Sequence, residues 1–151
     1  MVEFKDECKK QVKDAKIVLE ENKARITFIN KKQNEYCKIN LECVFRNNDA
    51  KHCDWLLISE NKNEKYCIEL KGSDILHGIK QLENTIKTLY PDERSYVFIV
   101  FSGKVSIPSF SSQQQKWKKR FKEKLKSTLY IKKTGCEFDL ESNEFIQNVK
   151  K

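Results

Sequence analysis

Residues 54–71 read DWLLISENKNEKYCIELK, two apolar runs separated by a short polar link. This pattern predicts two antiparallel strands joined as a hairpin. Because successive side chains of a strand point to opposite faces, Glu69 and Lys71 share one face of the second strand, and their apolar neighbours form the other face. Asp54 opens the first strand. Three charged groups are therefore expected to meet at one end of the hairpin.

The periodicity around this hairpin predicts the order helix, three or four strands, helix, strand, helix, strand. The expected helices are 3–22, 75–89 and 113–126, and the expected strands are 24–30, 36–45, 54–59, 66–71, 95–101 and 128–132. After Gly135 the chain gives no clear signal. With 151 residues, no internal repeat and no long linker, the sequence predicts a single domain over residues 1–151.

Asp54 followed by Glu69-x-Lys71, set between a strand meander and an amphipathic helix, resembles the PD-(D/E)xK nuclease superfamily over residues 36–101. The resemblance implies an α/β, restriction endonuclease-like fold, with a central mixed β-sheet flanked by α-helices. Its expected core is αβββαβ, with an extra N-terminal strand and a basic C-terminal helix. Cys53 stands where the family often has proline before the aspartate.

The resemblance also implies a chemistry. Asp54 and Glu69 would bind Mg²⁺ or Mn²⁺, and Lys71 would orient or deprotonate the attacking water. Phosphodiester hydrolysis independently requires an activated water, a Lewis acid and relief of developing negative charge. Carboxylate oxygens suit Mg²⁺. The structural alternative is a simple salt bridge between Glu69 and Lys71.

A third metal-binding acid is expected from a neighbouring element, as the resemblance implies. Glu42 is the main candidate, on the polar face of the strand expected over residues 36–45, and Glu7 and Glu20 are weaker alternatives. Gln81, on the helix after the Glu69 strand, is a candidate for contacting a phosphate or a metal-bound water. Its alternative is a solvated helix glutamine.

The excess positive charge lies in one segment. The chain has a net charge of +8, and residues 116–133 hold nine basic residues against one acidic residue. A polyanion is the natural partner of such a segment. We expect nucleic-acid contacts from Lys116, Lys118, Lys119, Arg120 and Lys122. A solvated helix face is the alternative, and the apolar stripe Trp117, Phe121 and Leu125 is expected to face the core.

Other features restrict the class of protein. No apolar run approaches the roughly 20 residues of a membrane-spanning helix, and the charged start lacks a secretory signal, so a cytoplasmic protein without membrane contact is expected. The six cysteines are then expected to be reduced thiols. Zinc ligation by His52, Cys53 and Cys67 is disfavoured because paired spacing is missing, and neither His52 nor His77 enters the expected mechanism.

The sequence thus favours a Mg²⁺-dependent nuclease, with DNA preferred over RNA as substrate. With one active site per chain, cutting both strands of a duplex would most simply need a homodimer. The second hypothesis is a non-catalytic nucleic-acid-binding or assembly module with the same fold. The third is a protein-interaction domain whose basic helix binds an acidic partner.

Overall fold

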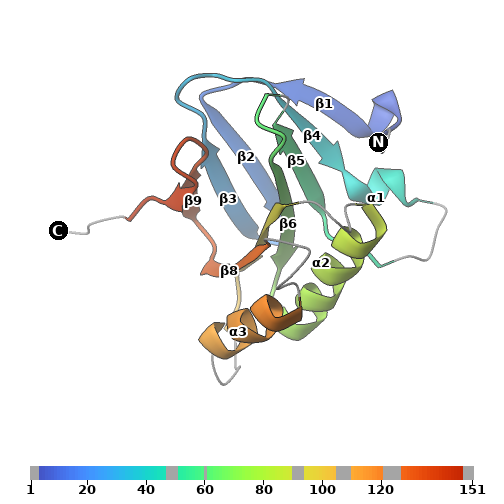
Figure 1. Cartoon of the computed structure of the whole chain (residues 1–151), viewed down its shortest axis with the longest axis vertical. Coiled ribbons are helices and arrows are strands. Elements are labelled where there is room, and N and C mark those ends of the chain that lie inside the picture. Colours follow the sequence, from blue (N-terminus) through green and yellow to red (C-terminus); the bar gives the residue numbers. More distant parts are fainter. Residues whose placement is uncertain are drawn as a thin grey trace.

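The computed structural model describes residues 4–46, 51–59, 61–89, 94–104, 110–120 and 127–147, and for Arg120 the backbone alone. In chain order the elements are η1 (Asp6–Cys8), β1 (Lys9–Val12), β2 (Lys16–Glu21), β3 (Ala24–Ile29), β4 (Tyr36–Asn40), α1 (Leu41–Val44), β5 (Trp55–Ser59), β6 (Lys65–Lys71), α2 (Ile75–Leu89), β7 (Ser95–Phe101), α3 (Phe110–Arg120), β8 (Thr128–Lys133), β9 (Cys136–Asp139) and β10 (Glu144–Phe145). Figure 1 shows their arrangement.

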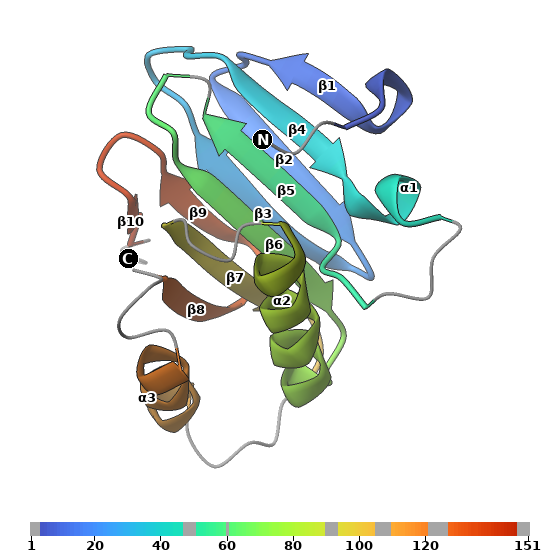
Figure 2. The same cartoon turned by 45° about the vertical axis from the view of Figure 1, so that its right-hand side comes forward.

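The largest element is a mixed six-stranded sheet in the order β1-β4-β5-β6-β7-β8. Its first four strands pair antiparallel, whereas β6, β7 and β8 are parallel. The parallel pairs are joined through α2 and α3, which lie on one side of the sheet (Figure 2). The α/β class and the mixed central sheet are therefore confirmed.

A second sheet, in the order β10-β9-β3-β2, covers the other face of the large sheet. Aromatic side chains fill the space between the two sheets, with Phe28, Tyr66, Phe98 and Phe138 in edge-on or stacked contacts. A separate apolar cluster packs α2 and α3 on the opposite face. The large sheet is thus buried on both faces, which explains why all seven residues of β7 are buried.

The central elements form as their sequence predicts. Asp74 caps α2, because its carboxylate accepts a hydrogen bond from the His77 amide at 3.1 Å. The buried positions of α2 include Ile75, Ile79 and Leu82, as the 4-3 spacing requires. The hairpin of β5 and β6 is antiparallel and pairs Trp55 with Ile68.

The helix expected over residues 3–22 is wrong. From Phe4 onward this segment forms η1, β1 and β2. Ile17 and Leu19 alternate with exposed residues, and Asn22 and Lys23 both have positive φ, of 52° and 64°. Such a two-residue turn matches the twist of a hairpin. Tertiary pairing of β2 with β3 therefore overrides the apparent helical spacing.

The strand expected over residues 36–45 is also wrong in its second half. β4 ends at Asn40, whose side chain accepts a hydrogen bond from the Cys43 amide at 3.2 Å and so caps the short helix α1. The chain beyond Gly135 has more structure than its sequence signals, since β9 pairs parallel with β3 and buries Phe138. α3 begins at Phe110, three residues earlier than expected.

The expectation of six reduced thiols is wrong for one pair. Cys8 and Cys43 form a disulfide that joins η1 to α1, whereas Cys37, Cys53, Cys67 and Cys136 are thiols outside any disulfide. Disulfides are typical of oxidising compartments, so the expected cytoplasmic location remains a prediction. Among the described residues, no helix is both long and apolar enough to cross a membrane.

Candidate active site at the ends of β5 and β6

Asp54 extends the β5–β6 ladder by one residue. Its amide donates to the Ile68 carbonyl at 3.1 Å, and its carbonyl accepts from the Leu41 amide at 3.1 Å. The Asp54 carboxylate accepts a hydrogen bond from the Leu70 amide at 2.8 Å. Both backbone and side chain are therefore fixed, and the carboxylate lies against the end of β6.

Glu69 and Lys71 share the face of β6 that lies under α2, as expected. Glu69 is 1% exposed, and its Oε2 lies 3.3 Å from the Lys71 ammonium. Its other oxygen, Oε1, is buried and has no hydrogen-bond partner in the described part of the chain. The structure thus brings Asp54, Glu69 and Lys71 to one place and leaves a buried acceptor unused.

Burial disfavours the ionised form of both carboxyl groups, and the charge of Asp54 further disfavours that of Glu69. Burial raises the pKa of Glu69 to about 8, the negative charge of Asp54 adds to this, and the Lys71 ammonium opposes it. Burial also raises the pKa of Asp54, against the opposing hydrogen bond from Leu70 and the charge of Lys71. A pair of this kind binds a proton or a cation readily.

The side chain of Gln81 contacts the segment that precedes Asp54 and is not solvated. Its amide nitrogen donates to the His52 carbonyl at 3.0 Å, while its Oε1 is buried without a partner among the described residues. One turn later, Thr85 accepts a hydrogen bond from the Cys53 amide at 2.8 Å. α2 therefore holds the segment that leads into Asp54.

Glu42 is not where the sequence places it. It lies on α1, not on a strand; its side chain is 81% exposed and sits 3.6 Å from the His52 imidazole. Within the described residues, no group of three or more His, Cys, Asp or Glu side chains is arranged to hold a metal ion. The alternatives fare no better, since Glu7 is exposed and Glu20 pairs with Arg25 on the surface.

Glu21 is an acid of this region that the sequence analysis missed. Burial raises its pKa, and the charges of Asp54 and Glu42 raise it further. The turn after Glu21 is tied to the site strand, because the Asn22 amide donates to the Leu70 carbonyl at 3.0 Å. Residues 16–21 alternate with Ile17 and Leu19 on one face, which predicts a strand that ends at Glu21. The helical spacing of residues 3–22 competes with this alternation and predicts a helix there instead.

The remaining donor set fits a magnesium-type ion. Mg²⁺ keeps several waters and takes only one or two protein carboxylates, with substrate phosphates completing its shell. Asp54 and Glu69 supply two carboxylates, and the buried oxygens of Glu69 and Gln81, which have no partner in the described part of the chain, are hard acceptors for an ion or its waters. The residues are therefore compatible with the expected cofactor.

The basic helix is described only in part. Trp117 is 2% exposed and donates to Ser127 at 3.0 Å, so its predicted core role is confirmed. Lys116, Lys118 and Lys119 are exposed, whereas Lys122, Phe121 and Leu125 lie outside the described residues, as does the side chain of Arg120.

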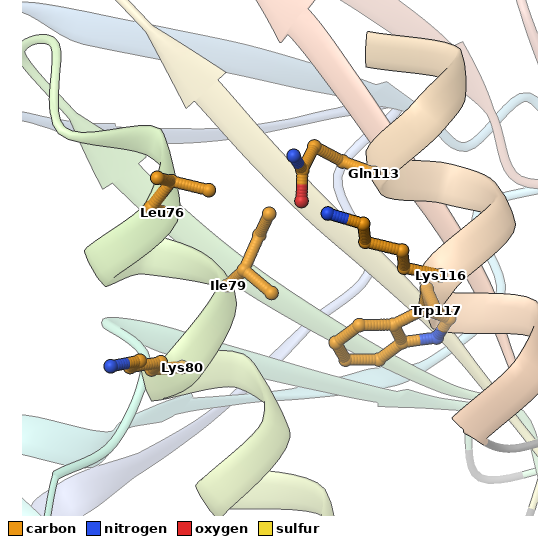
Figure 3. Close-up of a pocket in the computed structure, with 6 residues that line it drawn as sticks. All are labelled: Leu76, Ile79, Lys80, Gln113, Lys116 and Trp117. Carbon is orange, nitrogen blue, oxygen red and sulfur yellow. The ribbon is translucent and has the colours of Figure 1, made fainter. Parts of the chain in front are cut away.

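A pocket of about 210 Å³ separates α3 from α2. Figure 3 shows Lys116 and Trp117 reaching from α3 toward α2, with Ile79 projecting back and the Lys80 ammonium directed away. Lys116 therefore lies across this pocket from the first turns of α2, the helix that covers Glu69 and Lys71.

Comparison with protein-family models, curated proteins and solved structures finds no match to this chain. The family resemblance consequently rests on Asp54, Glu69, Lys71 and the order of the elements around them.

Proposed function

We propose that the protein is a metal-dependent nuclease that hydrolyses phosphodiester bonds, with DNA as its favoured substrate. The observation that carries the proposal is the meeting of Asp54, Glu69 and Lys71, with one Glu69 oxygen buried and without a hydrogen-bond partner among the described residues. A solvated salt bridge would not need a second, half-buried carboxylate beside it, because like charges withdrawn from water are costly. Three parallel strands and two helices then supply a rigid frame for this group.

Asp54 and Glu69 would hold the metal ion in this proposal. When bound, Mg²⁺ or Mn²⁺ supplies Lewis-acid activation of water and neutralises charge that develops on the phosphoryl group. Lys71, whose ammonium already lies at Glu69, is positioned to donate a hydrogen bond to the attacking water or to a phosphoryl oxygen. Gln81 has a free acceptor that suits a proton of that water.

The direct test is cleavage of labelled single-stranded DNA, duplex DNA and RNA with Mg²⁺, Mn²⁺ or EDTA. We expect metal-dependent cutting that falls about 100-fold or more in Asp54→Asn and in Lys71→Ala. Lys62→Ala is the matched control, because it removes one exposed lysine from the turn at the opposite end of β6. Cleavage that survives EDTA, or equal losses in all three variants, would contradict the proposal.

The non-catalytic binding module remains the second candidate. It is favoured by the lack of a third clustered acid in the described residues. Its signature would be salt-sensitive nucleic-acid binding without turnover by the folded protein in any of these metals.

A further inference from the structure

A pocket opens beside the candidate active site, at the ends of β7 and β8. Its volume is about 570 Å³, within the range of about 300–1,000 Å³ that small-molecule sites occupy. Its lining residues are Phe101, Ser102, Gly103, Lys104, Phe110 and Lys133. The pocket therefore combines aromatic rings with two lysines.

The backbone joins this pocket to the site. Lys71 pairs with Phe101 in the sheet, and Phe101 pairs with Lys133, so the three residues form one row across the ends of parallel strands. Past the strands, the Ser102 amide donates to the Lys71 carbonyl at 3.0 Å, and the Gly103 amide donates to the Gly72 carbonyl at 2.6 Å. At the usual strand spacing, the backbone of Lys133 lies about 10 Å from that of Lys71.

The chemistry of the lining suits an anion attached to a flat ring. The Phe110 ring is half-buried and lies 5.6 Å from the ring of Phe101, which is only 9% exposed and belongs to the core under α2 and α3, so Phe110 offers the accessible aromatic face. Lys104 and Lys133 are exposed, and neither forms an ion pair with a described residue. Aromatic faces with adjacent cations are the usual means of holding an unpaired nucleotide.

We infer that this pocket binds one unpaired nucleotide of the substrate strand, next to the bond that Asp54, Glu69 and Lys71 would cleave; the inference rests on the proposed function. A base stacks on Phe110 only when it is released from its neighbours in the strand, whereas Lys104 and Lys133 attract its phosphates. The preferred substrate is therefore single-stranded nucleic acid, or an unpaired end of a duplex.

Binding is measured in EDTA, so that its result is independent of cleavage. The probes are a fluorescein-labelled single-stranded oligonucleotide and a blunt hairpin duplex of equal phosphate number. The Lys104→Ala/Lys133→Ala protein is compared with Lys31→Ala/Lys62→Ala, which removes the same charge from exposed turns at the opposite end of the strands. We expect the pocket pair to weaken single-strand binding about tenfold, the duplex less, and the control pair less than twofold.

A second variant tests whether the Phe110 ring stacks on the base. Phe110→Leu keeps an apolar side chain and is expected to weaken single-strand binding about fivefold or more, with circular dichroism and thermal melting confirming the fold. Unchanged single-strand binding in both pocket variants, or equal losses for duplex and single strand, overturns the inference while leaving cleavage untouched. Pocket-dependent single-strand binding by a protein that never cuts supports the nucleotide pocket and rejects the nuclease. A protein that neither binds nor cuts rejects both.

Discussion

The two ends of β6 carry buried polar groups of opposite character. At its start, the Tyr66 hydroxyl donates to Asn143 at 2.7 Å, and the Asn143 amide donates in turn to Glu64 at 2.9 Å. At its end, Glu69 and Gln81 each keep a buried oxygen without a hydrogen bond to any described residue. One strand thus begins in a satisfied network and ends in an unsatisfied one.

The two ends of β6 thus hold two kinds of buried polar group: one forms hydrogen bonds that hold the fold together, and the other has acceptors left for a ligand. A buried network that satisfies its donors and acceptors fixes a unique packing. An unpaired buried carboxylate costs stability, and native proteins keep such groups mainly where a ligand, proton or ion completes them. The Lys71 end of β6 is therefore the end where we place the proposed site, and the Lys65 end holds β9 and β10 onto the sheet.

The largest expected effect comes from Glu69→Gln in metal-free protein. Because the pKa of Glu69 is raised to about 8 in the folded state, its protonated form stabilises the fold at low pH, and this contribution is lost as pH rises through 8. Glutamine is neutral throughout. We expect the variant to gain on the order of 3 kcal/mol over wild type between pH 5 and pH 9, measured by urea unfolding in EDTA.

The control for this comparison is Glu20→Gln, which neutralises an exposed carboxylate. Its stability difference from wild type should stay within about 0.5 kcal/mol at both pH values. Adding Mg²⁺ at pH 8 should raise the melting temperature of wild type and leave Glu69→Gln unchanged. A wild-type free energy of unfolding that does not fall toward pH 9 would show that burial does not disfavour the ionised form of Glu69.

The second largest effect is expected from Gly103→Ala, at the same end of the sheet. A Cβ on Gly103 would meet the Gly72 carbonyl oxygen at 2.8 Å, so the two loops after β6 and β7 must separate. The expected loss is about 2 kcal/mol. Gly72→Ala is the matched control, since nothing lies within 4 Å of its Cβ. Equal urea midpoints for the two variants would contradict the close loop contact.

A smaller effect is expected at the satisfied end. Tyr66→Phe leaves Asn143 without its donor and should cost about 1 kcal/mol, equally at pH 5 and pH 8. Tyr130→Phe is the control, because it removes the same hydroxyl from another tyrosine whose ring contacts Phe138. A loss of stability that differs between pH 5 and pH 8 would mean that a titrating group also acts on the start of β6.

The sequence predicts the centre of this molecule better than its margins. The elements from β5 to β8, and the meeting of Asp54 with Glu69 and Lys71, follow from alternation and helical spacing that local sequence encodes. The N-terminal segment misleads, because Cys8, Val12 and Leu19 fit a helical stripe while pairing with distant strands requires an extended chain. Similarly, Asn40 caps a short helix that contains Glu42. The alternation of residues 36–45 predicts a continuing strand instead, and so places Glu42 on a strand.

The smallest effect is expected at Gly78, where α2 crosses the Lys71 end of β6. A Cβ there would lie 3.4 Å from both Glu69 Cγ and Lys71 Cγ, and 3.5 Å from Ile99 Cδ1, which is ordinary contact. Alanine also favours a helix over glycine by about 1 kcal/mol. Gly78→Ala should therefore match or slightly exceed wild-type stability by urea unfolding and retain activity. Gly78→Leu, by contrast, must displace Glu69 or Lys71, so cleavage should fall more than stability does. If Gly78→Ala lowered stability and cleavage as much as Gly78→Leu, α2 would lie closer to Glu69 and Lys71 than ordinary contact. The Glu69 oxygen would then lack a partner because α2 crowds it, and not because a ligand binds there.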